Sequence, residues 1–128
     1  MNKTYSFNVS KNVVHISHMI TALWLVYIGY MTIKNKDINK INFRILLILG
    51  IILVIYFSMI IYKNYKKELQ YAFGVHKNII HLAHILNGIL FILLGLKKIE
   101  IKDLISSYIM IYGALGGAYH SHLMYLRI

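Results

Sequence analysis

The chain has 128 residues, of which 59% are hydrophobic and only 14% are charged, and its formal net charge is +10. This composition does not fit a soluble domain, because four long apolar runs dominate the sequence. The absence of cysteine excludes disulfide bonds and thiolate metal sites. The basic residues lie almost entirely outside the apolar runs, which favours contact with the anionic headgroups of a lipid bilayer over contact with nucleic acid or an acidic protein.

Each apolar run has about the length that a helix needs to cross the hydrocarbon core of a membrane. The expected spans are residues 13–33, 43–62, 79–96 and 104–126. The polar N-terminal residues do not predict a cleavable signal peptide. Because helices pair their own backbone groups in lipid and short loops join antiparallel neighbours, we predict an all-α integral membrane four-helix bundle.

The sequence contains an internal repeat. Residues 5–18 match residues 71–84 at an offset of 66, with Tyr, Phe, Val, Lys, Asn and both histidines on identical letters. In each copy an asparagine, Asn12 or Asn78, is the expected N-cap of the span that follows.

A second stretch extends the repeat. Residues 50–62 match residues 113–125 at an offset of 63, with glycine, serine and two tyrosines in shared places. The two repeats, about 5–62 and about 71–126, are therefore predicted to be tandem hairpins of two spans each. Since each hairpin crosses twice, both copies enter from the same side, which makes a parallel repeat. Lysine and arginine are evenly divided between the two faces, so the positive-inside rule predicts no orientation.

Topology places all seven histidines near the face that bears both termini. The first and third spans each begin with two histidines three residues apart, and such a spacing puts both side chains on one helix face. Ionisable residues inside a bilayer are costly and are functional candidates by default. The expected ligands are His15, His18, His81, His84 and His120.

His120 and His122 are about 200° apart around a helix, so only one of them faces inward. We expect this to be His120, because it continues a face of small residues that suits close helix packing or a flat ligand. The small residues expected to line the site are Ala22, Gly88, Gly113 and Gly116. Thr21 and Asn87 occupy equivalent places beside the histidine face, where a hydrogen bond would fix a histidine tautomer.

Three functions fit this pattern. The leading hypothesis is a histidine-lined site for haem b or for copper, zinc or iron, with a role in electron transfer. The first alternative is a non-catalytic structural or assembly subunit of a membrane complex or virion membrane, whose histidines lock the hairpins together. The second alternative is a proton or cation conduit, although the opposite half of the membrane offers no histidine or acid to continue a path.

Enzymatic activity is the less favoured expectation, because no Asp or Glu lies within a predicted span. A bundle of this size exposes much apolar surface, which predicts other membrane subunits or a homo-oligomer as partners. If only one repeat has kept a working site, we expect it to be the second, built on His81 and His84.

Overall fold

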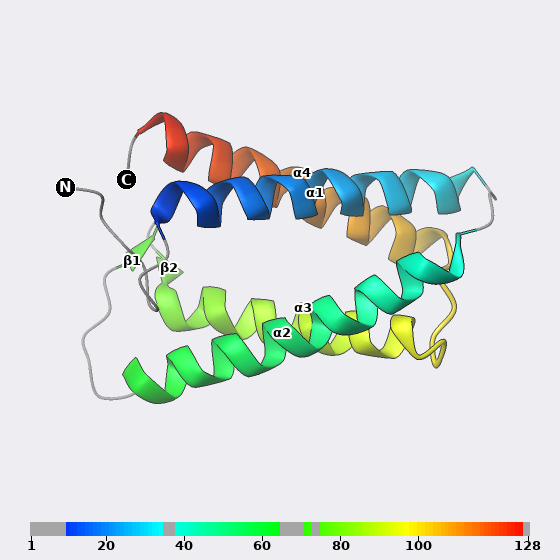
Figure 1. Cartoon of the computed structure of the whole chain (residues 1–128), viewed down its shortest axis with the longest axis horizontal. Helices are drawn as coiled ribbons and strands as arrows, with labels where there is room; N and C mark the ends of the chain where they lie inside the picture. The colour runs from blue at the N-terminus through cyan, green and yellow to red at the C-terminus, as the bar shows by residue number, and fades with distance from the viewer. Residues whose placement is uncertain (1–9, 35–37, 65–70, 73–74, 127–128) are drawn as a thin grey trace. The chain divides into compact units, whose positions relative to one another are not determined.

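The computed structural model describes residues 10–34, 38–64, 71–72 and 75–126, and four α-helices make up most of these residues (Figure 1). The helices are α1 (Lys11–Ile33), α2 (Lys40–Asn64), α3 (Lys77–Gly95) and α4 (Asp103–Tyr125). Two-residue strands, β1 (Tyr71–Ala72) and β2 (Val75–His76), pair antiparallel directly before α3. The predicted all-α class is confirmed.

The helices α1 and α3 begin earlier than the asparagine caps predicted. Ser10 is the N-cap of α1, and its hydroxyl accepts a hydrogen bond from the Val13 N–H at 3.3 Å. His76 is the N-cap of α3, and its Nδ1 accepts from the Asn78 N–H at 3.2 Å. The prediction was wrong because a serine hydroxyl and an imidazole nitrogen two residues upstream reach the first-turn N–H groups, which places Asn12 and Asn78 inside the helices.

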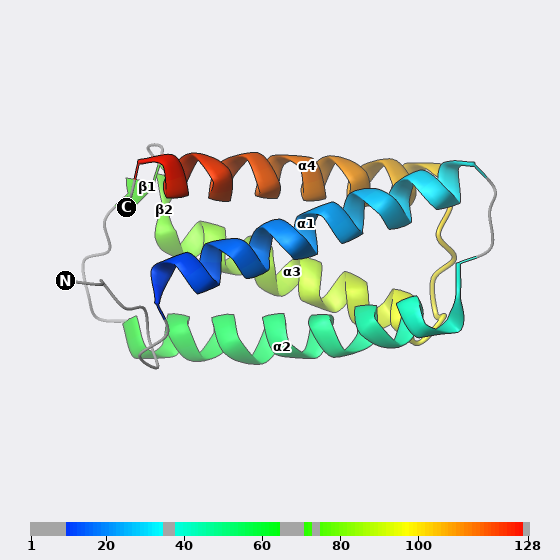
Figure 2. The ribbon, with the colours of Figure 1, turned by 45° about the horizontal axis from the view of Figure 1, so that its top comes forward.

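The helices form two compact units, each an antiparallel pair (Figure 2). One unit contains α1 and α4, and the other, Asn39–Glu100, contains α2 and α3. Each unit therefore pairs helices from different predicted hairpins, which joined the first span to the second and the third to the fourth. The physical reason is that small residues let the backbone of α1 lie close to α4, and the backbone of α3 lie close to α2.

Glycine brings the backbones of α2 and α3 into direct contact. A Cβ atom added to Gly50 would lie 2.5 Å from the carbonyl oxygen of Gly88, and one added to Gly88 would lie 2.8 Å from the carbonyl oxygen of Gly50. In the α1/α4 pair, a Cβ on Gly113 would lie 2.7 Å from the carbonyl oxygen of Ala22. The repeat offsets place Ala22 on Gly88 and Gly113 on Gly50, so the two contacts occupy equivalent positions.

A second close approach lies near the opposite end of each pair. A Cβ on Gly29 would lie 2.9 Å from the Cβ of Met110, and a Cβ on Gly95 would lie 2.6 Å from the Cβ of Leu47. Gly29 and Gly95 are 66 residues apart, and Leu47 and Met110 are 63 residues apart. The two helix pairs therefore pack through matching positions at two levels along their length.

A left-handed residue ends α3. Lys97 has φ 55°, its N–H donates to the Leu94 carbonyl, and the Lys98 N–H donates to the Leu93 carbonyl, both at 2.9 Å. This pair of bonds is a Schellman motif, which satisfies carbonyls at the end of the helix. The Lys97 Nζ then lies 5.0 Å from the ring centroid of Phe43 near the start of α2, and this cation–π contact ties the two helix ends together.

Three of the helices are long and apolar enough to cross a membrane, namely α1, α2 and α3, which indicates a membrane protein. The fourth predicted span, now α4, does not belong to this group. Serine, glycine and histidine lower its apolar character, and several of these residues face α1. Ser106 is fully buried, and Gly113 touches the α1 backbone, whereas Leu104 and Leu115 are exposed.

The glycine contact in the α2/α3 pair yields a stability prediction. Gly50→Ala should destabilise the protein by about 1–3 kcal/mol, because the added methyl group meets the Gly88 carbonyl and forces the helices apart. Gly116→Ala is the matched control, since a Cβ there has no atom within 4 Å, and its effect should be neutral or stabilising by up to about 1 kcal/mol through helix propensity. Thermal unfolding of the detergent-solubilised protein, followed by circular dichroism, measures both; equal stability of the two variants would contradict the contact.

Candidate functional site

Three imidazole rings meet near one end of the α1/α4 pair. His15 and His18 extend from the second turn of α1, and His120 extends from the C-terminal part of α4. The Nδ1 atoms of His15 and His120 lie 2.9 Å apart. The ring centroids of His18 and His120 are 4.1 Å apart with an interplanar angle of 32°, and those of His15 and His120 are 5.2 Å apart. We call these three residues the imidazole cluster.

The backbone contact between Ala22 and Gly113 determines which histidines meet. Seven residues, about two helical turns, separate His15 from Ala22 on α1 and Gly113 from His120 on α4. Because the helices are antiparallel, two turns along each of them lead to the same end of the pair. His15 and His120 therefore face each other at a separation that the small residues set.

The hydrogen bond between His15 and His120 constrains their tautomers. A neutral imidazole has one nitrogen that donates and one that accepts. A bond between two Nδ1 atoms therefore requires that one ring carries its proton on Nδ1 and the other does not. His15 is only 1% exposed, so this bond satisfies a polar atom that would otherwise be costly to bury.

The hydrogen bond of His18 defines its tautomer when the ring is neutral. Its Nδ1 lies 2.7 Å from the Val14 carbonyl oxygen, one turn earlier in α1. Since a carbonyl oxygen only accepts, the His18 Nδ1 carries the proton and its Nε2 carries the lone pair. A backbone carbonyl on one ring nitrogen is the arrangement that commonly orients a metal-ligating histidine.

The α2/α3 pair repeats this geometry with one ring exchanged. Phe57 lies where His120 lies in the other pair, 63 residues earlier in the sequence. Its ring centroid is 4.4 Å from that of His84 and 5.4 Å from that of His81. The corresponding distances from His120 are 4.1 and 5.2 Å, so the aromatic contacts are nearly superimposable.

The exchange leaves a polar atom without a partner. The Nδ1 of His81 is buried and has no hydrogen-bond partner among the described residues. The equivalent atom in the other pair is the His15 Nδ1, which bonds to His120. Phe57 has no nitrogen to offer. The sequence favoured a site in the repeat that contains His81 and His84. The contacts between imidazoles lie instead in the helix pair that contains His15 and His18.

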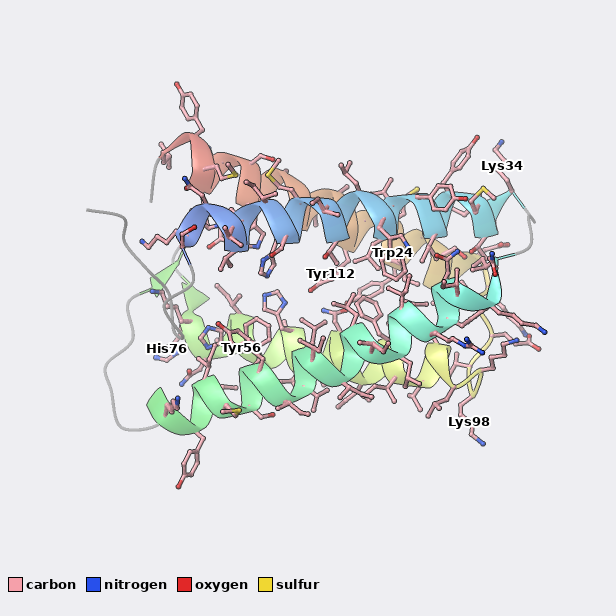
Figure 3. The ribbon with its side chains drawn as sticks, in the orientation of Figure 1. Trp24, Lys34, Tyr56, His76, Lys98 and Tyr112 are labelled. Carbon is pink, nitrogen blue, oxygen red and sulfur yellow. The ribbon has the colours of Figure 1, made fainter. Side chains whose placement is uncertain are left out.

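Histidines outside the cluster occupy other positions. His122 is exposed, on the outward side that its spacing from His120 predicted. His76 serves as the α3 cap, and Figure 3 shows it near the same end of the α2/α3 pair as Tyr56.

The other predicted lining residues make contacts within or between helices. The Thr21 hydroxyl donates to the Ser17 carbonyl at 2.9 Å, and the Asn87 amide donates to the Ala83 carbonyl at 2.8 Å. Both bonds run to the residue four places earlier, so these two equivalent side chains fasten to their own helix. Ala22, Gly88 and Gly113 lie at the helix contacts described above, while Gly116 faces open space.

Phe57 is the residue that sequence reasoning overlooked. The signal was present, because the repeat aligns Tyr56-Phe57-Ser58 with Tyr119-His120-Ser121. A phenylalanine in an apolar run carries no functional signal of its own. Its position becomes informative only when the helix that it contacts is known.

A preformed metal site is not present in the described part of the chain, where no group of three or more His, Asp or Glu side chains is arranged to hold an ion. The cluster shows why. Two nitrogens bound to one tetrahedral zinc ion are about 3.3 Å apart, given zinc–nitrogen bonds of about 2.0–2.1 Å, whereas the His15 and His120 Nδ1 atoms are 2.9 Å apart. The rings stand at hydrogen-bond distance, and a small rotation of each would be required to admit an ion.

The bond between His15 and His120 predicts an energetic coupling. In a double-mutant cycle, the combined variant of His15→Ala and His120→Ala should lose about 0.5–2 kcal/mol less stability than the two single variants lose in sum. The reason is that either change alone removes the shared bond. A cycle that pairs His15→Ala with the exposed His122→Ala should be additive. Unfolding in mixed detergent micelles measures both cycles, and equal coupling in the two would contradict the contact.

Comparison of the chain with protein-family models, curated proteins and solved structures found no match.

Proposed function

We propose that this chain is a small multi-pass membrane protein that binds a transition-metal ion through His15, His18 and His120. The convergence of three imidazoles from two helices at one end of the α1/α4 pair is the observation that carries the proposal. Imidazole nitrogen suits zinc, copper and iron. Three protein ligands leave a fourth position for water or a substrate, as in zinc sites that perform chemistry.

The tautomers support this assignment. The Val14 carbonyl orients the His18 ring and leaves its Nε2 able to bind a metal ion. An ion would take the place of the proton shared by His15 and His120, so the Nδ1 atoms that now face each other would become ligands. A redox-active ion in this position would serve electron transfer, and a zinc ion would activate a bound water.

Haem is the less favoured ligand for this cluster. A haem iron with two axial histidines needs the two rings on opposite sides of the macrocycle. The rings in the α1/α4 pair instead contact one another, with centroids 4.1 and 5.2 Å apart.

Four membrane crossings fit the packing of α4. This helix lies antiparallel to α1 from the contact at Gly29 to the contact at His15 (Figure 2). A helix that pairs along the length of a membrane-spanning partner is placed in the bilayer with it, and polar atoms that face the partner are sheltered from lipid. The large apolar residues exposed on α2 supply a lipid-facing surface: Ile41, Ile45, Ile48, Ile51, Ile52 and Ile55. Basic residues at the helix ends, among them Lys34, Lys98 and Lys102, suit anionic headgroups.

A structural role is the second candidate, and one observation favours it. The Nδ1 atoms of His15 and His120 already satisfy each other, and Phe57 fills the equivalent place in the other pair through ring contacts with His81 and His84. The cluster would then fasten α1 to α4 in a subunit that assembles with other membrane proteins. In this role the cluster needs no ion.

Metal content separates the two candidates. Protein purified in mild detergent should bind about one equivalent of Zn²⁺ or Cu²⁺, and His18→Ala should abolish most of this binding while the protein stays folded, because His18 lies outside the bond between His15 and His120. His84→Ala is the matched control and should retain binding. Inductively coupled plasma mass spectrometry and a metal titration provide the measurement, and a Soret band would instead identify haem. Metal-free protein that stays so in the titration would favour the structural role.

The absence of cysteine allows a clean test of topology. Single cysteines at Lys34 and Lys102 should react with an impermeant thiol reagent from one side of sealed vesicles, and those at Lys63 and Leu126 from the other. Labelling after detergent lysis controls for reactivity. If Lys102→Cys and Leu126→Cys react from the same side, α4 does not cross the membrane.

A further inference from the structure

The two helix pairs differ at the single position that decides whether three imidazoles can converge. His120 in α4 and Phe57 in α2 are equivalent by the repeat, by their ring contacts and by their distance from the glycine contact. Phe57 lies seven residues after Gly50, and His120 lies seven residues after Gly113. Both pairs thus carry the same scaffold and the same two histidines on the partner helix.

We infer that the α2/α3 pair is a second copy of the metal site from which one ligand is missing, and that Phe57 confines metal binding to the α1/α4 pair, one ion per chain. This inference rests on the proposed function and names the residue that determines which half of the protein binds. The class of ligand is the same divalent transition-metal ion that three imidazole nitrogens would hold.

A buried nitrogen in the α2/α3 pair marks the place of the missing ligand. The His81 Nδ1 is buried without a hydrogen-bond partner among the described residues, whereas the His15 Nδ1 has one. Buried polar atoms nearly always have a partner, and an exception calls for an explanation. The repeat supplies it, because the ring that would have provided a nitrogen at this place is a phenylalanine.

The ring of Phe57 also fills the space in which a third imidazole would lie. Phe57 is 7% exposed and its ring occupies the space beside His81 and His84, with centroids 5.4 and 4.4 Å away. An imidazole is smaller than a phenyl ring, so histidine fits this space without displacing the helices. The backbone contact between Gly50 and Gly88 holds the separation of the pair, as the contact between Gly113 and Ala22 does in the other.

The test counts ions bound to four full-length proteins titrated with Zn²⁺ and, separately, Cu²⁺. The natural chain should bind one ion, Phe57→His two, His120→Phe none, and the combined variant one, with the ion moved to the α2/α3 pair. Phe57→Leu is the matched control, since it removes the ring without adding a nitrogen, and should still bind one. Adding His84→Ala to the combined variant should abolish its site.

The outcomes separate the inference from the proposed function. If the natural chain binds no ion, the proposed function fails. If the natural chain binds one ion and folded Phe57→His also binds only one, the inference alone is overturned. Should Phe57→His not fold, His120→Phe decides, because it copies the ring contacts already present in the α2/α3 pair: loss of the ion from folded protein supports the inference, and retention of the ion overturns it.

Discussion

The direct contact of helix backbones at small residues is the constraint on which the rest of this structure depends. Gly50 meets Gly88 and Gly113 meets Ala22 with no room for a side chain between them. Each contact fixes both the separation and the register of its pair. In a membrane, where apolar side chains gain little by leaving lipid, such close packing is a main source of helix association. The histidines then meet because they lie two turns from these contacts.

The same scaffold carries two different chemical environments. In one pair, His15 and His120 share a proton across the helix interface. In the other, Phe57 fills the equivalent space, and the His81 Nδ1 has no described partner. The aromatic packing is almost unchanged by the exchange, so packing and polar chemistry vary independently here. A phenyl ring can therefore take the place of an imidazole at this position without changing the geometry of the ring contacts.

Much of this arrangement could be predicted, and the failures have definite causes. Apolar runs predicted the helices, and the face of small residues that His120 continues predicted that His120, and not His122, faces a neighbouring helix. The N-caps were predicted two residues too late, because neighbouring polar side chains can each accept from the N–H groups of the first turn. The geometry of that turn decides between Ser10 and Asn12. The pairing of helices within each unit was not predictable, because the repeat shows which segments are related, while the fit of two helix surfaces shows which of them touch.

Local properties of the chain by themselves determined the four helices, the face that carries each histidine pair and the match between the two sequence repeats. These depend on hydrophobicity and on the angle of about 100° per residue, which are readable over a few turns. Only the tertiary structure decided that α1 packs on α4 and α3 on α2, and hence that His15 and His18 meet His120 while His81 and His84 meet Phe57. That choice depends on contacts between residues as far apart as His15 and His120, and no local pattern contains them.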